Sequence, residues 1–142
     1  MSDKSTRIGE IVALHHHREG PLLPILNDVQ AAFGCVDAEA EALIAKGLNL
    51  SRADVHGVVS FYHDYKPQAD ARPVVQVCRA EACKARGVEA IVAAAEAAAG
   101  ARVKIETVYC LGLCSAGPAA RTGDDLHIRL DAQSIAELVE NA

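Results

Sequence analysis

Four of the five cysteines in this 142-residue chain form two close pairs, and these pairs restrict the fold more than any other feature. Cys78 and Cys83 have the spacing C-x4-C, and Cys110 and Cys114 have the spacing C-x3-C. Each pair directly follows a short run of β-branched residues that predicts a strand. Because the loops that follow neighbouring strands lie at one edge of a sheet, we expect the four thiols to converge there.

Four converging thiolates suit either a tetrahedral zinc ion or an iron–sulfur cluster. Structural zinc sites use cysteines separated by two to four residues, which includes both spacings found here. A 2Fe–2S cluster takes two cysteines per iron, and backbone N–H groups in the longer loops donate to its sulfurs. Gly112 would let the backbone approach such a cluster without a Cβ clash. The spacing favours iron–sulfur but leaves open zinc and also a thiol oxidoreductase, which typically has C-x2-C.

The first half of the chain is predicted to be helical, because apolar residues recur at helical spacing in four stretches. One helix covers residues around 8–14 and ends near Gly20. A second begins after Pro21 or Pro24, since proline is tolerated in a first helical turn. Asp37 is placed to cap a third helix, and the sequence from Ser51 to Asp54 has the capping-box pattern that begins a fourth.

The second half has the pattern of a small α/β layer fold of order β-α-β-β-β-α. It follows a predicted linker, residues 65–72, which is poor in apolar periodicity. Short β-branched runs predict strands, and the Ala-rich stretch predicts a strong helix. The expected strands are 74–77, 103–109, 118–121 and 126–130, and the expected helices are 82–99 and 131–140. We therefore expect an N-terminal helical subdomain, residues 1–66, and a second domain, residues 73–142.

Composition and charge exclude several classes of function. The net charge of −5 argues against nucleic acid as a partner, because phosphate binding needs a cationic surface. Residues 38–62 resemble a helix-turn-helix, but the second helix opens with only Arg52 beside Asp54, which is too little positive charge to hold DNA. The longest apolar run, residues 90–99, is too short to span a membrane. With no signal peptide in residues 1–10, a cytoplasmic location is expected, where clustered cysteines indicate metal or redox chemistry.

Two cysteine motifs resemble the cluster-binding signature of the thioredoxin-like 2Fe–2S ferredoxins. They are Val77-Cys78-Arg-Ala-Glu-Ala-Cys83 and Tyr109-Cys110-Leu-Gly-Leu-Cys114-Ser-Ala-Gly-Pro118. Gly20-Pro-Leu-Leu-Pro-Ile-Leu26 and Val55-His-Gly-Val-Val-Ser-Phe-Tyr62 resemble the helical lead-in of the small ferredoxin-like subunit of the NADH-oxidising module of complex I. The resemblance extends from about residue 7 to the end of the chain. The stretch between the two cysteine pairs is short for the family, which predicts trimmed loops.

The resemblance implies an α/β protein in which an N-terminal helical bundle precedes a thioredoxin-like 2Fe–2S ferredoxin domain. It assigns one 2Fe–2S cluster to Cys78, Cys83, Cys110 and Cys114 and no catalytic residue to this chain. The chain would be an electron-transfer subunit of an oxidoreductase complex. A flavin- and NAD-binding partner would hold FMN and NAD, and an Fe–S and molybdenum-containing catalytic partner would hold further clusters and the molybdenum cofactor. The helical half would dock on the flavoprotein.

Within this family the short chain and the segment Ser60-Phe-Tyr-His-Asp-Tyr65 most resemble the gamma subunit of soluble NAD-dependent formate dehydrogenase. The equivalent subunits of NADH-quinone oxidoreductase and of NAD-reducing hydrogenases are alternatives. A zinc-stabilised module that binds a partner protein is the alternative from another class of function.

The remaining residues with reactive or charged side chains have less specific interpretations. Cys35 is interpreted as an inert, partly buried thiol, and residues 15–17, three consecutive histidines, as a solvated helix end. His56 and His63 either contact a partner or pack within the chain. Four cations either tune the potential of the cluster or are ordinary surface charges: Arg79, Lys84, Arg86 and Arg121.

Overall fold

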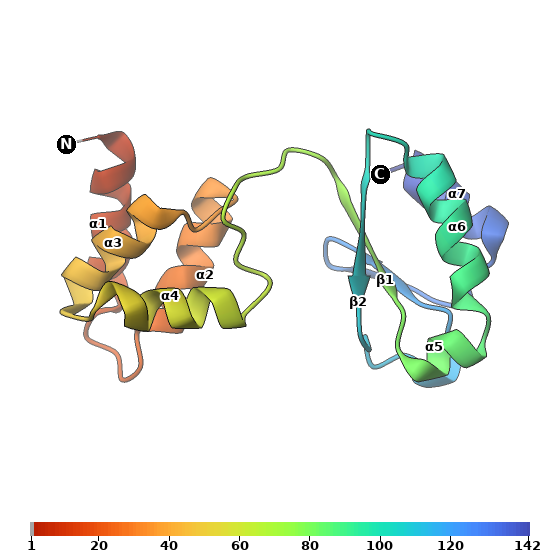
Figure 1. The fold of residues 1–142 in the computed structure, drawn as a ribbon, viewed down its shortest axis with the longest axis horizontal. Helices are drawn as coiled ribbons and strands as arrows, with labels where there is room; N and C mark the ends of the chain where they lie inside the picture. The colour runs from red at the N-terminus through yellow and green to blue at the C-terminus, as the bar shows by residue number, and fades with distance from the viewer. Residues whose placement is uncertain (1) are drawn as a thin grey trace. The chain divides into compact units, whose positions relative to one another are not determined.

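The computed structural model describes residues 2–142 as a mixed α/β chain. It divides into two compact units, Met1–Asp70 and Ala71–Ala142 (Figure 1). Each unit has its own cluster of buried apolar residues. Within residues 2–142, no helix is both long and apolar enough to cross a membrane.

The N-terminal unit is built of helices that bury one apolar stripe each. The helices in residues 2–70 are α1 (Asp3–His15), α2 (Leu22–Phe33), α3 (Ala38–Leu48) and α4 (Arg52–Phe61). Their stripes meet in one core, whose most deeply buried large side chains are Ile8, Ile25, Leu26, Val29, Ile44 and Val55. The periodicity of the sequence therefore predicted these helices correctly.

Local hydrogen bonds explain where these helices begin and end. The Asp37 carboxylate accepts a hydrogen bond from the Ala40 N–H at 3.0 Å and caps α3. Ser51 and Asp54 form the predicted capping box at the start of α4. Gly34 ends α2 in the left-handed conformation, with φ of 70°, which glycine adopts without a steric cost.

The segment that follows α4 is anchored to the helical unit. The Tyr65 ring is buried, and its hydroxyl donates to Asn27 Oδ1 at 2.8 Å. The Lys66 carbonyl accepts from the Val36 N–H at 2.7 Å, and its own N–H donates to Gln30 Oε1 at 3.0 Å. The prediction that the linker begins at residue 65 is therefore wrong, because these two residues pack against the helices.

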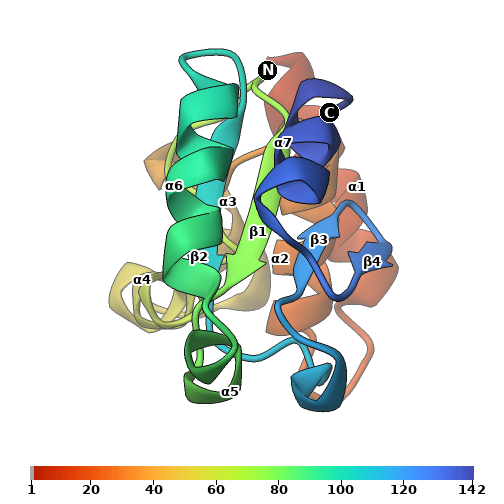
Figure 2. The same ribbon diagram turned by 90° about the vertical axis from the view of Figure 1, so that its right-hand side faces the viewer.

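The C-terminal unit is a mixed sheet with helices on one face (Figure 2). Its elements are β1 (Val74–Cys78), α5 (Glu81–Ala85), α6 (Val88–Ala99), β2 (Lys104–Val108), the short 3-10 helix η1 (Cys114–Ala116), β3 (Ala120–Thr122), β4 (Asp125–His127) and α7 (Ala132–Glu140). The strand order is β2-β1-β3-β4, in which β1 pairs parallel to β2 and antiparallel to β3. Val75 and Val77 of β1 lie at the centre of the core that the sheet shares with α6 and α7.

The structure corrects two details of the predicted second half. The helix predicted over residues 82–99 is two helices, because Gly87 between them takes a left-handed φ of 86° that ends α5. The strands predicted over 118–121 and 126–130 are shorter, β3 and β4, and Gly123 at φ of 57° begins the turn that joins them. The backbone turns in this half therefore depend on glycines that a propensity argument alone does not place.

Candidate functional site

The loops that carry the four predicted cysteines follow the parallel neighbours β1 and β2, which finish at the same end of the sheet (Figure 2). Cys78 is the last residue of β1, and the Cys110 N–H donates to its Sγ at 3.3 Å. The Cys83 thiol lies close enough to the Cys78 thiol for each to shift the pKa of the other. Cys110 Sγ lies 3.6 Å from Cys114 Sγ. The thiols thus meet as two pairs, one from each loop.

Helical turns and unusual backbone angles bring each pair together. The short helix α5 returns Cys83 toward Cys78, and Cys114 opens the 3-10 helix η1, which packs against α5. Cys110 adopts a left-handed φ of 77°, which is sterically unfavourable for a residue with a Cβ. Strained residues of this kind concentrate at functional sites. The unusual backbone conformation of this loop is therefore part of how the thiols are placed.

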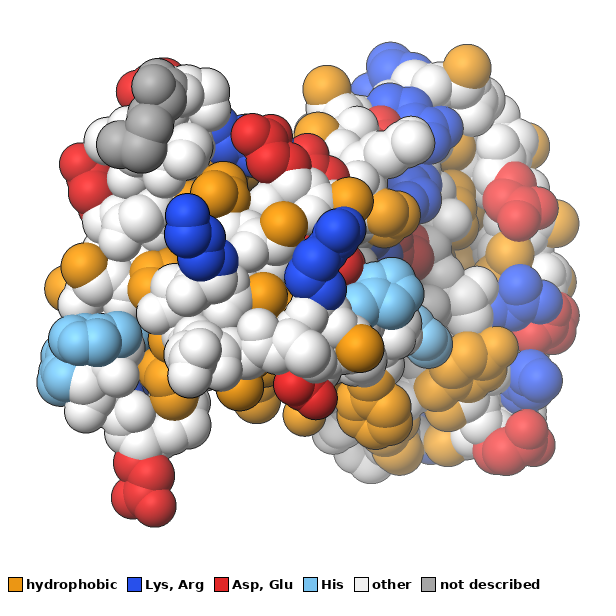
Figure 3. Space-filling model, turned by 60° about the vertical axis from the view of Figure 1, so that its left-hand side comes forward, with side chains coloured by type: hydrophobic (Ala, Val, Ile, Leu, Met, Phe, Trp, Pro, Cys, Tyr) orange, Lys and Arg blue, Asp and Glu red, His pale blue; other side chains and the backbone are white. Residues whose placement is uncertain are grey.

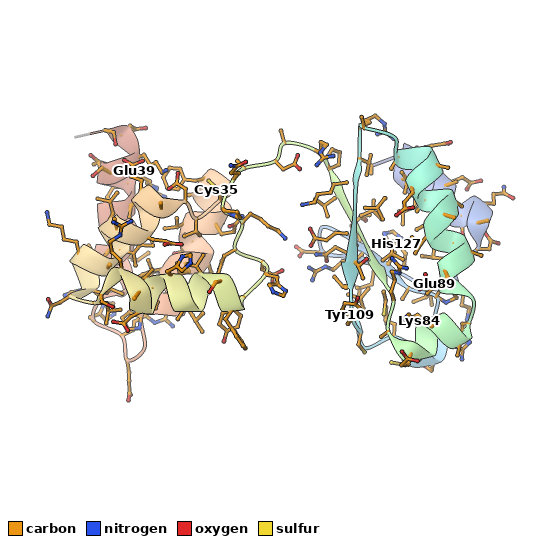
Figure 4. All side chains as sticks on the ribbon, viewed as in Figure 1. Cys35, Glu39, Lys84, Glu89, Tyr109 and His127 are labelled. Carbon is orange, nitrogen blue, oxygen red and sulfur yellow. The ribbon has the colours of Figure 1, made fainter. Side chains whose placement is uncertain are left out.

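The two pairs differ in their exposure to solvent. Cys78 and Cys83 are each 2% exposed, whereas Cys110 and Cys114 lie on the surface. Tyr109, directly before the exposed pair, leaves 75% of its surface open to solvent at the end of β2 (Figure 4). The site thus has a buried side and a side that a partner molecule can reach.

Backbone N–H groups surround the sulfur of Cys78. Burial raises the pKa of this thiol, but hydrogen bonds from the N–H groups of Ala80, Cys110 and Leu111, and from the Cys83 thiol, outweigh burial, so the pKa is lowered. In the second loop the Gly112 N–H donates to Cys110 Sγ at 3.3 Å. Gly112 has a φ of 76°, so glycine is required here for its conformation. These donors favour negatively charged sulfur.

The pKa values of two other thiols are raised. For Cys83 the causes are burial first and then the hydrogen bond with Cys78, which together outweigh a hydrogen bond from the Ala119 N–H. For Cys114 the pKa is raised by its hydrogen bond with Cys110 and by the negative charge that Cys110 would carry. These opposing effects show that the four thiols influence one another, as thiols must when they share one site.

The site fits a 2Fe–2S cluster in its donor set. Such a cluster is held by four cysteine thiolates, two for each iron, and is stabilised by N–H groups that donate to sulfur. The pairing of the thiols and the donors around Cys78 and Cys110 match these needs. In the described part of the chain, residues 2–142, no group of three or more His, Cys, Asp or Glu side chains is arranged to hold a metal ion, and the four cysteines stand as two pairs.

Two of the candidate cations, Arg79 and Arg121, are engaged with partners in this chain. The Arg79 guanidinium pairs with Glu89, donating from Nε at 3.2 Å and also from a terminal nitrogen. Arg121 Nε donates to Gln76 Oε1 at 2.9 Å. Lys84 lies on α5 (Figure 4), where its positive charge contributes to lowering the pKa of Glu89 after the larger effects of Arg79.

The other residues singled out from the sequence lie in the helical unit. Cys35 is partly buried and belongs to a different unit from the four paired cysteines (Figure 4). The solvated-end interpretation is wrong for His15, whose Nε2 lies 2.6 Å from Asp28 Oδ2 with its side chain 12% exposed. His56 Nδ1 lies 3.1 Å from Glu41 on α3, and 67% of the His56 side chain remains exposed.

Sequence reasoning expected N–H donors in the cysteine loops but did not identify most of the residues that supply them. The N–H groups of Ala80, Leu111 and Ala119 act on the buried thiols, and Gly117 lies against Cys83. The identity of an alanine or leucine gives no signal that its N–H will face sulfur. Gly117 stands within the second cysteine motif, and this position is the signal that could have identified it.

Comparisons with known proteins agree with this geometry. The family model of the thioredoxin-like 2Fe–2S ferredoxins matches residues 8–142. A subunit of the NADH-quinone oxidoreductase of Escherichia coli K12 is 31% identical over 137 residues, covering 88% of this chain and 82% of that protein. HndA, a subunit of the NADP-reducing hydrogenase of Solidesulfovibrio fructosivorans, is 27% identical over 119 residues, covering 78% of this chain and 70% of that protein.

A solved structure has the same fold. A chain of an NAD+-reducing NiFe-hydrogenase in the air-oxidised state superposes with a TM-score of 0.70 at 26% identity, over 84% of this chain. This chain spans 22% of the length of that hydrogenase chain.

Proposed function

Because the chain belongs to the thioredoxin-like 2Fe–2S ferredoxin family, we propose that it is an electron-transfer subunit that holds one 2Fe–2S cluster on Cys78, Cys83, Cys110 and Cys114. The observation that supports this most directly is that Cys110 joins the two loops: its N–H donates to Cys78 Sγ at 3.3 Å, and its own Sγ lies 3.6 Å from Cys114 Sγ. When bound, such a cluster accepts and releases one electron at a time.

The surroundings of the thiols suit a site whose negative charge increases on reduction. Reduction adds one negative charge to a site that four thiolates already make negative. N–H groups that donate to Cys78 and Cys110 stabilise that charge without adding a bulky side chain. The exposed pair leaves one side of the site open to a redox partner, and catalysis of a substrate belongs to other subunits.

The partner proposed for this chain is a flavin- and NAD-binding subunit of a hetero-oligomeric oxidoreductase. The names of the relatives, a subunit of NADH-quinone oxidoreductase and a subunit of an NADP-reducing hydrogenase, support an assembly of this type. A soluble NAD-dependent formate dehydrogenase in the cytoplasm is the specific assembly proposed, with Fe–S and molybdenum cofactors in its catalytic subunit. NADH-quinone oxidoreductase and NAD-reducing hydrogenase are the alternatives.

The helical unit is the proposed docking module for the flavoprotein subunit. Several of its large apolar side chains stay exposed: Leu14, Leu23, Leu50, Phe61 and Tyr62. One hollow of about 640 Å³ beside α2, α3 and α4 is lined by Leu23, Leu50 and Tyr62, together with the positively charged residue Arg18. Figure 3 shows apolar side chains of this unit lying among basic ones and histidines. Exposed apolar groups gathered in this way are typical of protein-binding surfaces.

The test is the metal content of anaerobically purified protein together with its EPR spectrum after dithionite reduction. We expect about two irons and two sulfides per chain, as a 2Fe–2S cluster requires, and a rhombic S = 1/2 signal. Zinc without sulfide would overturn the proposal and indicate a structural, partner-binding module.

Serine variants test the ligand assignment. Cys110→Ser and Cys114→Ser each replace one exposed thiol, so we expect loss of most of the bound iron or a changed EPR signal. Cys35→Ser is the matched control, because Cys35 lies in the helical unit and should leave iron and signal unchanged. Full iron with an unchanged signal in both exposed-pair variants would contradict the assignment.

A further inference from the structure

The segment Gly117–Ala119, which we call the strap, lies against both buried cysteines although it contains no cysteine itself. The Ala119 carbonyl accepts a hydrogen bond from the Cys78 N–H at 3.0 Å. The Ala119 N–H lies close enough to the Cys83 thiol to act against the raised pKa of that thiol. One buried residue, 1% exposed, therefore connects the two buried cysteines.

Gly117 lies beside the Cys83 sulfur. A β-carbon at this position would lie 3.0 Å from Cys83 Sγ and 3.4 Å from Arg86 Cδ. The first distance is closer than ordinary contact between nonbonded atoms, so the neighbouring atoms would have to move. Gly117 also has φ of −69°, which any residue can adopt. Space beside the sulfur, and not backbone conformation, is what requires glycine here.

The strap is held in place from its other side. The Ala116 carbonyl, directly before the strap, accepts from the Arg129 N–H at 2.8 Å. The Pro118 carbonyl accepts from the Leu130 N–H at 3.1 Å. The segment that leads into α7 therefore fixes the strap, and a side chain added at Gly117 would displace Cys83 and α5 more readily than the strap.

We propose that Gly117 and Ala119 are positioning residues that hold the Cys83 thiolate and set the reduction potential of the site. This inference rests on the proposed 2Fe–2S function. Gly117 provides the space for the sulfur, and the Ala119 N–H supplies a hydrogen bond that favours the more negative, reduced state. A buried sulfur cannot replace that bond with one from water.

The first experiment is a redox titration of the full chain carrying Gly117→Ala. Displacement of Cys83 from the Ala119 N–H should disfavour reduction. We expect the ratio of reduced to oxidised protein at a fixed potential to fall about tenfold, which is a decrease of about 59 mV for one electron. Gly57→Ala is the matched control, because a β-carbon there meets no atom within 4 Å. Its potential should equal that of the unmodified protein.

Arg86→Ala separates the two contacts that the new β-carbon would make. Gly117→Ala combined with Arg86→Ala keeps the clash with Cys83 and removes the one with Arg86. The strap proposal predicts that Gly117→Ala lowers the reduction potential by the same amount in both backgrounds. The decrease from Arg86→Ala to the double variant should therefore equal the decrease from the unmodified protein to Gly117→Ala. A decrease that vanishes in the Arg86→Ala background would overturn it.

Hydrogen exchange of the unmodified protein tests the proposal without any substitution. The Ala119 N–H should exchange slowly, because Ala119 is buried and the strap proposal has its N–H bonded to Cys83. Rapid exchange at Ala119, or a Gly117→Ala chain with two irons and an unchanged potential, overturns the inference and leaves the proposed function intact. Absence of iron and sulfide from the unmodified protein overturns both.

Discussion

The two cysteine pairs differ in exposure because they follow different kinds of strand. β1 has β2 on one side and β3 on the other, so Cys78 at its end is enclosed. β2 is an edge strand, and the loop that follows it carries Cys110 and Cys114 at the surface. The exposed pair, beside the exposed ring of Tyr109, is therefore the side of the proposed site that a redox partner can approach.

Asp37 is predicted to make the helical unit sensitive to acid. Its carboxylate caps α3 and lies 2.6 Å from Lys4 Nζ on α1. The hydrogen bond from Lys4, and then that from the Ala40 N–H, lower the pKa of Asp37 from its ordinary value of 3.8. A lowered folded-state pKa gives stability that is present above 3.8 and is lost as the pH falls through the lower value.

Asp37→Ala should therefore destabilise the chain by about 1 kcal/mol at pH 7, the usual effect of losing an N-cap. The difference from the unmodified protein should shrink as the pH falls well below 3.8, measured by urea unfolding. Asp37→Asn is the control, because an asparagine oxygen can still accept from the Ala40 N–H. A difference that is the same in neutral and strongly acidic solution would contradict this account.

Local residue patterns explain why some contacts could be predicted and others could not. The caps at Asp37 and Ser51 lie within three residues of the groups they bind, so their spacing is visible in the sequence. His15 pairs with Asp28, on the next helix, and Tyr65 with Asn27, 38 residues away. Such partners are set by how helices pack, which the spacing along one helix does not contain.

At the scale of elements, the break between α5 and α6 separates a helix that carries a proposed ligand from a helix that covers the sheet. α5 carries Cys83 at the site, whereas α6 covers the sheet with Val88, Ile91 and Val92. The Ala-rich composition favours helix throughout, and so predicted one continuous helix. The left-handed Gly87 ends α5 and lets the two helices take different directions.

Gly87→Ala is predicted to destabilise the C-terminal unit by about 1–2 kcal/mol, the cost of a left-handed residue with a Cβ. Because α5 must shift to relieve this strain, retention of iron should also fall. Gly57→Ala, inside α4 at an ordinary helical φ, should leave stability unchanged or raised. Urea unfolding followed by circular dichroism measures both variants, and equal stability of the two would refute the prediction.

The element order of the second half explains how much of the site the sequence could predict. The sequence predicted that each cysteine pair follows a strand. This was sufficient to place both loops at one end of the sheet, because β1 and β2 are parallel neighbours. The strap could not be predicted in the same way. Its contribution comes from the backbone of Ala119 and from the lack of a side chain at Gly117. Neither is recognisable in the sequence as a ligand.

At the scale of the whole molecule, the two units have separate cores. The helical core centres on Ile25, Leu26 and Ile44, and the core of the second unit on Val75 and Ile135. The proposed cluster ligands all belong to the second unit, and the hollow that exposes apolar side chains belongs to the first. Cluster binding and partner binding are therefore expected to be separable by mutation.

Removal of residues 1–66 is predicted to leave the cluster but weaken assembly. The shortened chain keeps all of Ala71–Ala142 with its core, so it should bind about two irons and give the EPR signal of the full chain. Without the hollow of the helical unit, its affinity for the flavin-binding subunit should fall at least about tenfold, or about 1.4 kcal/mol. Size-exclusion chromatography of the two subunits together measures this loss.

Cys110→Ser in the full chain is the reciprocal control for this truncation. It removes an exposed ligand and keeps the whole helical unit, so it should lose iron and still assemble. A shortened chain that assembles as tightly as the full chain would refute the docking role of the helical unit. Loss of assembly in Cys110→Ser as well would instead indicate that the exposed cysteine loop, with Tyr109, forms part of the contact with the partner.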